Sequence, residues 1–313
     1  MEGTEIKMTD LKFKPVEAED MKVLAPYFGL RPNKTCDSVP LDSFIWRKYY
    51  HVRYAIHENK ALLWLMKEDG VMHSAMPLCK EEDLKKYFDM TVEYFNQVLH
   101  IPFKIYLADE EAIEFLHLKE SEDFVVTEQE DLKDYLYDGE AMRKLSGKKL
   151  HKKKNHLNAF LKEYEGRYEF RRLCCSDRDD VWRFLDRWRE RKGDEVEEHL
   201  DYEVEGIHEI LKQCLDLDIR MSGVYIDGKL EAFTIGSYNQ AENMAVIHIE
   251  KANPEIRGLY QFINQQFLVQ EFPDVTLVNR EDDLGQEGLR HAKMSYNPCG
   301  FARKYLVQQK NFN

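Results

Sequence analysis

The sequence lacks the long apolar runs that would mark a membrane or a secreted protein. Its longest apolar run, Ala61–Met66, is far shorter than the roughly 20 residues that span a bilayer. The opening segment, MEGTEIKMTDLKFK, carries charges where a signal peptide would need an uninterrupted apolar core. We therefore expect a cytoplasmic protein without a transmembrane segment.

Cysteine is scarce, and its spacing does not match the common cysteine frameworks. The six cysteines form no Cys-X-X-Cys pair, which argues against a zinc site and against a disulfide framework. A reducing compartment fits this pattern. Adjacent Cys174 and Cys175 could act as a redox pair, but we expect a strand that places one thiol on each face.

An excess of positive charge is also missing. The net charge is −13, from 58 acidic and 45 basic residues, which argues against a chain that coats nucleic acid or anionic membranes. One segment departs from this balance, because residues 144–156, KLSGKKLHKKKNH, hold six lysines and two histidines. As a helix it would turn Leu150 and Leu157 inward and its lysines outward. The segment is either a solvated helix face or a phosphate contact through Lys149, Lys152 and Lys153.

The sequence does contain enough apolar material for two cores. With 313 residues, 43% of them hydrophobic, two domains are the better expectation. A strand, two helices, three antiparallel strands, a helix, a strand, a helix and a strand are predicted in that order twice. We therefore predict an α/β (α+β) fold with two mixed central sheets flanked by helices. The predicted domains are residues 1–140 and 165–313, joined by a basic helix over 141–164.

This order of elements resembles the GNAT acyltransferase fold, here in tandem. In that fold, the start of the helix after the fourth strand binds the pyrophosphate of coenzyme A, because its unpaired amides and its dipole attract anions. The resemblance implies donor-binding residues at the end of the strand over 244–252 and in the loop that follows it. These residues are Lys251, Asn253, Arg257, Gly258, Leu259, Tyr260 and Gln261.

The two halves differ at this position. In the second half, Gly258 would let the backbone approach the donor and Arg257 would add charge. The corresponding helix start in the first half carries Glu81, Glu82 and Asp83, whose carboxylates would repel a phosphate. We therefore expect the donor in the second half and a structural or acceptor-side role for the first.

Candidate catalytic residues lie on the strand over 244–252. Alternation places His248 and Glu250 on one face, near the donor end. Acyl transfer to an amine needs a base, for which Glu250 is the first candidate, with His248 orienting or replacing it. The GNAT resemblance implies that Tyr296 protonates the leaving group. The alternatives are a core histidine, an ion pair of Glu250 with Lys251 or Arg280, and a packing tyrosine.

A second polar segment, NREDDLGQEGLR, follows an apolar strand. Three acids precede a short helix, and at least one is expected to cap it. The surplus acids and the nearby Arg290 and Lys293 form either a salt-bridge network or a site for an acceptor amine. We assign Asp283 to structure and predict no metal site. The predicted acceptor contacts are Asn279, Glu281 and Asp282.

Three stretches resemble the phosphatidylglycerol lysyltransferase C-terminal domain family, a tandem-GNAT group akin to the Fem-type aminoacyl transferases. They are SGKKLHKKKNHLNAF, VIHIEKANPEIRGLYQFIN and LVNREDDLGQEGLRHAKMSYNP. The resemblance implies an acyltransferase that uses acyl-coenzyme A or aminoacyl-tRNA as donor. Its acceptor would be an amine or hydroxyl of a small molecule, a peptide or a lipid headgroup. The alternative is a binding protein that keeps the nucleotide groove without turnover.

Overall fold

The computed structural model describes residues 11–192 and 198–312, which fold into two compact units. Unit 1 comprises residues 1–133 and 302–313, and unit 2 comprises residues 134–301. This division differs from the predicted domains 1–140 and 165–313, because the segment 141–164 falls within unit 2. The single basic helix predicted there is wrong, since the segment contains parts of two helices, over residues 139–144 and 151–163, with a break between them. The C-terminal strand, which we assigned to the second domain, falls within unit 1.

Unit 1 contains two antiparallel sheets, in the strand orders β1-β2-β3-β4 and β5-β14-β6. Its strands are β1 (Lys14–Pro15), β2 (Arg53–His57), β3 (Ala61–Glu68), β4 (Val71–His73), β5 (Lys104–Asp109), β6 (Phe124–Glu128) and β14 (Lys304–Gln309). Its helices are α1 (Met21–Phe28), α2 (Pro40–Ile45), α3 (Leu84–Glu93) and α4 (Glu110–Phe115). The apolar run Ala61–Met66 forms β3, and its first five residues are buried.

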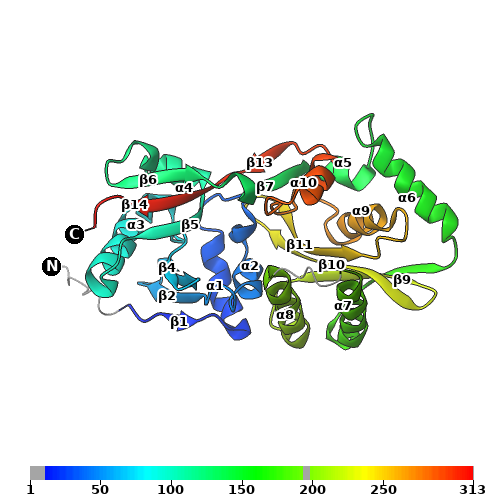
Figure 1. Cartoon of the computed structure of the whole chain (residues 1–313), viewed down its shortest axis with the longest axis horizontal. Helices are drawn as coiled ribbons and strands as arrows, with labels where there is room; N and C mark the ends of the chain where they lie inside the picture. The colour runs from blue at the N-terminus through cyan, green and yellow to red at the C-terminus, as the bar shows by residue number, and fades with distance from the viewer. Residues whose placement is uncertain (1–10, 193–197, 313) are drawn as a thin grey trace. The chain divides into compact units, whose positions relative to one another are not determined.

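Unit 2 is built on one sheet, in the strand order β13-β7-β12-β11-β10-β9-β8. Its strands are β7 (Asp134–Asp138), β8 (Tyr168–Arg172), β9 (Arg220–Ile226), β10 (Lys229–Asn239), β11 (Met244–Ala252), β12 (Leu277–Asn279) and β13 (Gly300–Ala302). Its helices are α5 (Gly139–Lys144), α6 (His151–Glu163), α7 (Arg178–Lys192), α8 (Glu198–Gln213), α9 (Leu259–Glu271) and α10 (Glu287–Met294). Helix α9 covers one face of the sheet, and α7 and α8 cover the other (Figure 1).

Two strands belong to a different unit from the domain in which we predicted their residues. Residues 134–138 of the predicted domain 1–140 form β7 of unit 2, and residues 304–309 of the predicted domain 165–313 form β14 of unit 1. Strand β7 lies between β12 and β13 in unit 2, and β14 lies between β5 and β6 in unit 1. The sequence did not predict β7, and it predicted one strand where β13 and β14 are separate. The segment DYLYD has aspartates at both ends and resembles a loop locally, so only its long-range pairing with β12 identifies it as a strand.

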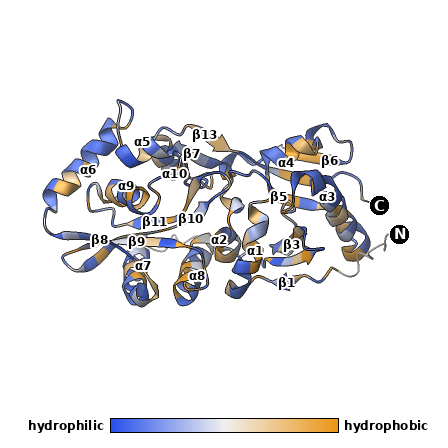
Figure 2. Cartoon of the chain, turned by 180° about the vertical axis from the view of Figure 1, so that it is seen from behind, coloured by the Kyte–Doolittle hydropathy of each residue, from blue (hydrophilic) through white to orange (hydrophobic). Residues whose placement is uncertain are grey.

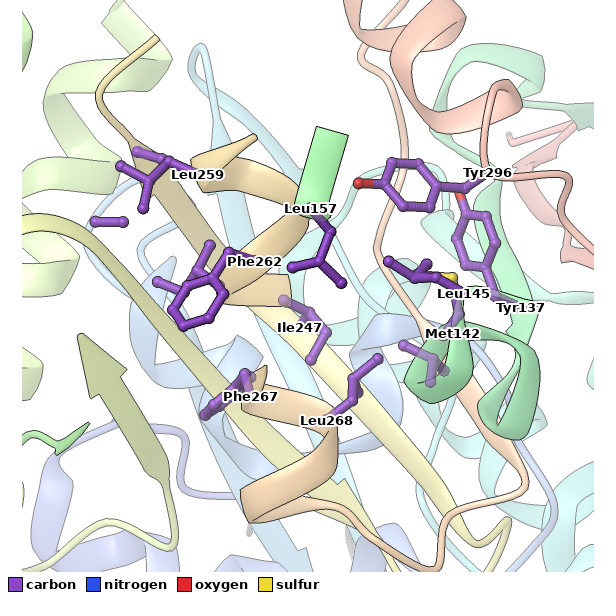
Figure 3. Packing of buried hydrophobic residues seen from close by; sticks show 14 of the residues in the cluster. Tyr137, Met142, Leu145, Leu157, Ile247, Leu259, Phe262, Phe267, Leu268 and Tyr296 are labelled. Atoms are coloured by element: carbon purple, nitrogen blue, oxygen red, sulfur yellow. The ribbon is translucent and has the colours of Figure 1, made fainter. Parts of the chain in front are cut away.

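The core of unit 2 lies between the sheet and helices α5, α6 and α9. Figure 3 shows the large side chains of α9, Phe262 and Phe267, close to Ile247 of β11 and Leu157 of α6. Leu150 and Leu157 are each 5% exposed, which confirms their predicted inward orientation. Most of α6 is hydrophilic (Figure 2). The apolar stripe of α6 therefore fixes the basic helix onto α9.

The cysteines of unit 2 differ from our expectation. Cys175 and Cys214 form a disulfide, although the spacing argued against one. Cys174 and Cys175 are not on a strand, since Cys174 caps the short 3₁₀ helix over residues 175–177 that precedes α7. A pair 39 residues apart leaves no local signal, because the folding of α7 and α8 brings it together. Among the described residues, no helix has the length and apolar composition of a membrane span.

Candidate functional site

Helix α6 packs across the start of α9. Gly258 caps α9 with φ of 84°, and a Cβ built on it would lie 2.1 Å from the carbonyl oxygen of His156. The missing side chain at Gly258 thus makes room for the backbone of α6, whereas we had assigned that room to a donor. Leu259 is fully buried, and Arg257 remains exposed at the helix start.

The carboxylate of Glu250 lies at the end of β11, on the side of α9. It accepts a hydrogen bond of 2.9 Å from Nη2 of Arg280 and one of 2.6 Å from Nδ2 of Asn264. The side chain of Glu250 is 9% exposed and that of Arg280 is 14% exposed. The predicted alternative of a Glu250–Arg280 ion pair is therefore present in the structure.

Tyr296 lies beside this ion pair. Its ring centroid is 4.8 Å from Cζ of Arg280, and Figure 3 shows its hydroxyl directed away from Tyr137 and toward the side of Leu157. Burial raises the pKa of Tyr296 to about 12, while the charge of Arg280 and hydrogen bonds with Gln261 and Arg280 act in the opposite direction. Tyr296 therefore keeps its proton at neutral pH and could donate it.

Lys153 of α6 reaches the same ring from another direction. Its Nζ lies 4.2 Å from the ring centroid of Tyr296. Burial lowers the pKa of Lys153, and the charge of Arg280 lowers it further. Lys149 and Lys152 of the same basic segment are exposed. The structure thus brings together four predicted residues, Glu250, Gln261, Tyr296 and Lys153, around Arg280.

His248 and Glu250 do not contact one another. The Nδ1 of His248 is 2.8 Å from Oε1 of Glu281, and its Nε2 is 3.1 Å from Oγ of Ser237. The imidazole is 1% exposed. His248 is thus a buried, hydrogen-bonded histidine, which was the predicted alternative to a catalytic role. The predicted acceptor contact Glu281 is one of its partners.

Other predicted contacts are engaged within unit 2. Lys251 pairs with Glu203 of α8 at 2.5 Å, and its Nζ lies 3.9 Å from the ring of Trp188. Asn253 donates to Glu231 at 2.9 Å. Tyr260 is partly buried. Asn279 is fully buried and donates a hydrogen bond to Asp134 at 2.9 Å. These bonds stabilise the ends of β11 and β12.

The acidic segment before α10 is a structural network. Asp283 accepts two hydrogen bonds of 2.9 Å from Arg290. Burial alone would raise the pKa of Asp283, but the bonds from Arg290 and Tyr135 hold it at about 2. Gln286, and none of the three acids, occupies the N-cap position of α10, without a side-chain capping bond, which contradicts our expectation. Lys293 donates to backbone carbonyls of Arg280 and Asp282, so it fixes the loop that carries Arg280.

A separate cleft of about 560 Å³ lies at the other end of α9. Its walls include Arg172, Arg220, Tyr238 and Glu271, and no predicted site residue lines it. Arg220 donates to the carbonyl of Glu271, and Arg172 pairs with the Glu271 carboxylate at 2.6 Å. Cations at a helix C-terminus are stabilising, which accounts for both arginines.

The sequence named Arg280 only as a partner for Glu250, whereas the structure places it at the centre of the site. Arg280 directly follows β12, and β12 pairs in parallel with only the first three residues of β11. The approach of Arg280 to Glu250 therefore depends on a pairing between distant segments and leaves no local signal. Asn264 gave a weak signal, being a polar residue on a face of α9 that is otherwise buried.

Comparison with known proteins gives matches over most of the chain. Residues 37–308 match the family described as phosphatidylglycerol lysyltransferase, C-terminal. An uncharacterised protein of Mycoplasmoides gallisepticum is 26% identical over 234 residues, which are 74% of this chain and 73% of that protein. A conserved protein of unknown function from Bacteroides thetaiotaomicron has a similar structure, with a TM-score of 0.85 and 25% identity over 96% of this chain and all of that one.

Two further structures share the fold at lower identity. L-PGS from Bacillus licheniformis has a TM-score of 0.68 at 15% identity, covering 96% of this chain and 95% of that one. FemX has a TM-score of 0.66 at 9% identity, covering 96% of this chain and 98% of that one. The predicted fold class is confirmed. Because the family model matches far more than half of the sequence, the chain belongs to the phosphatidylglycerol lysyltransferase C-terminal domain family.

Proposed function

We propose that the chain is an aminoacyltransferase that moves an aminoacyl group from tRNA to an amine or hydroxyl acceptor. The observation that carries the proposal is the cluster of Glu250, Arg280 and Tyr296 in unit 2, which joins a carboxylate, a cation and a protonated phenol. The name of the family, phosphatidylglycerol lysyltransferase, supports the same class of reaction.

The cluster provides an acid and a base for transfer of the aminoacyl group from its ester to an amine or a hydroxyl. The acceptor attacks the ester carbonyl carbon, a new C–N or C–O bond forms, and the bond to the ribose oxygen breaks. Glu250 takes the acceptor's proton directly or through water, since each of its oxygens accepts one hydrogen bond and could accept a second. Tyr296 gives its proton to the leaving ribose oxygen. Arg280 holds both groups in place.

Two observations favour aminoacyl-tRNA over acyl-coenzyme A as the donor. The basic segment over 144–156 carries exposed lysines on the first turns of α6 and just before it, which suits the repeated phosphates of RNA. The loop glycine that would approach a pyrophosphate is instead packed against His156. The acceptor is a small molecule, a peptide or a lipid headgroup, and we assign none of these.

Thermal unfolding with coenzyme A, acetyl-coenzyme A or aminoacyl-tRNA tests the donor. A ligand at 100 times its dissociation constant adds about 2.7 kcal/mol to the free energy of unfolding. We expect aminoacyl-tRNA to stabilise the wild type. Stabilisation by coenzyme A that disappears in Arg257→Glu, with no response to aminoacyl-tRNA, would overturn the proposal and place a thioester donor at the start of α9.

A further inference from the structure

Two cations in unit 2 lie against one aromatic ring, and among the described residues only one of the two has a carboxylate partner. Nζ of Lys153 and Cζ of Arg280 lie 4.2 Å and 4.8 Å from the ring centroid of Tyr296. Glu250 pairs with Arg280. Among the described residues, no carboxylate or hydrogen-bond acceptor pairs with Lys153. One positive charge in a mostly buried site is therefore uncompensated.

Arg280 also has an unused donor. Its Nη1 is buried and has no hydrogen-bond partner among the described residues, although Nη2 bonds Glu250 at 2.9 Å. An unmet buried donor costs about 1–3 kcal/mol, and more on a charged group. Attraction to the ring of Tyr296 stabilises one cation beside it. A second cation beside the same ring is repelled by the first. Burial lowers the pKa of Lys153, and the repulsion from Arg280 lowers it further.

The charge and the position of the site restrict the missing ligand. One excess positive charge matches the single negative charge of a phosphodiester, whereas the pyrophosphate of coenzyme A carries more. Lys153 belongs to a segment whose Lys148, Lys149, Lys152 and Lys154 are exposed. A row of exposed cations leading to a half-buried one fits a polymer of phosphates better than a single headgroup.

We infer that Lys153 and Arg280 together bind one phosphodiester of the RNA donor, the one on the 5′ side of its 3′-terminal nucleotide. This phosphate is the closest one to the ribose oxygen that Tyr296 protonates. The inference rests on the proposed function, and it adds a positioning contact that fixes the terminal nucleotide at the transfer site. Lys153 supplies Nζ, and Arg280 supplies Nη1.

A binding experiment with deacylated RNA tests the contact without any chemistry. Fluorescence anisotropy is measured for an acceptor-stem minihelix with a normal or a methylphosphonate linkage before its last nucleotide. The methylphosphonate removes the charge of that linkage. The proteins are wild type, Lys153→Met, Lys153→Arg and Lys162→Met. Lys162 is an exposed lysine at the other end of α6 and provides the matched control.

We expect the neutral linkage to weaken binding to wild type by about tenfold or more. Lys153→Met should bind the normal RNA more weakly than wild type by a similar factor, and the neutral linkage should not weaken its binding further. Lys153→Arg and Lys162→Met should behave as wild type does. Thermal unfolding of each variant confirms that it is folded.

Three results would overturn the inference. Lys153→Met could bind the normal RNA as tightly as wild type does. It could lose as much from the neutral linkage as wild type loses, which would place that phosphate elsewhere. Alternatively, wild type could ignore the minihelix but bind phosphatidylglycerol vesicles in a Lys153-dependent manner, which would assign the pair to a lipid phosphate.

Failure of the contact differs from failure of the proposed function. If the minihelix binds through Lys153 but no aminoacyl group is transferred from aminoacyl-tRNA, the contact stands and the function fails. If transfer occurs and neither Lys153→Met nor the neutral linkage changes it, the function stands and the contact fails.

Discussion

Each unit contains a buried arginine–carboxylate pair, and the two pairs differ in how the arginine bonds its carboxylate and in the charge around it. In unit 1, both Nη atoms of Arg31 bond Asp109, at 2.5 and 2.6 Å, and Asp109 also caps α4. In unit 2, Arg280 bonds Glu250 through Nη2 alone, and its Nη1 has no partner among the described residues. Each arginine keeps one buried donor without a partner among the described residues, Nε of Arg31 and Nη1 of Arg280. The first pair is bidentate and stabilises a helix, whereas the second is joined through one nitrogen and lies beside the ring that Lys153 also contacts.

The helix starts of the two units show the same contrast. Helix α3 of unit 1 follows Glu81, Glu82 and Asp83, which lie at the surface or partly buried there. Helix α9 of unit 2 follows Gly258 and has no acidic residue in its first turn. A buried ion pair is therefore informative about function mainly when a neighbouring cation leaves the surrounding charge uncancelled.

The largest effect is expected for Arg31→Met. Removal of Arg31 leaves the Asp109 carboxylate buried without its charge partner, and the two side chains are only 4% and 3% exposed. We expect the free energy of unfolding to fall by about 3–5 kcal/mol, with no change in transfer rate per folded molecule. Urea denaturation and a transfer assay would check this. A loss of activity without a loss of stability would break the distinction between the pairs.

The disulfide of unit 2 should have the next largest effect. The bond between Cys175 and Cys214 closes a loop of 39 residues that contains α7 and α8. From the entropy of such a loop, we expect the variant with serine at both positions to lose about 3–4 kcal/mol of unfolding free energy. The free Cys299 provides the control, as Cys299→Ser. Equal stability of the double variant and the control would contradict the structure at this point.

Tyr296→Phe should separate catalysis from stability. Burial holds the pKa of Tyr296 at about 12, so the hydroxyl is protonated throughout the neutral range. Without this acid, we expect the rate of aminoacyl transfer to fall by about a hundredfold, or about 2.7 kcal/mol in the barrier. The melting temperature should change little because the ring remains. An unchanged rate would leave Tyr296 as a packing residue.

Acid should destabilise unit 1 through His73, which has no role in the proposed site. Burial lowers the pKa of His73 to about 4, from the 6.5 that is usual for an exposed histidine. Above pH 6.5, His73 is neutral in both the folded and the unfolded chain. The loss of unfolding free energy therefore begins as the pH falls below that value, where only the unfolded chain takes up a proton. We expect a loss of about 2 kcal/mol by pH 5. His73→Phe should remove that share, as urea denaturation at pH 7 and pH 5 would show.

The elements of the fold could be predicted from sequence more fully than its connections. The alternation of Met244–Ala252 and the glycine before α9 identified the strand and the helix that carry the site. Strand β7 and the Cys175–Cys214 bond could not be predicted, because each depends on contacts between distant segments. The centre of the site was missed for the same reason, since Arg280 reaches Glu250 only after β12 pairs with β11.

The most direct test of the account is transfer of a radiolabelled amino acid from aminoacyl-tRNA by wild type, Arg280→Lys and Arg31→Lys. Lysine keeps the charge in both variants but has no second donor in the guanidinium plane. We predict transfer by wild type, a loss of about a hundredfold in Arg280→Lys, and an undiminished rate per folded molecule in Arg31→Lys. Equal rates in the two variants, or transfer from acetyl-coenzyme A and none from aminoacyl-tRNA, would contradict the account.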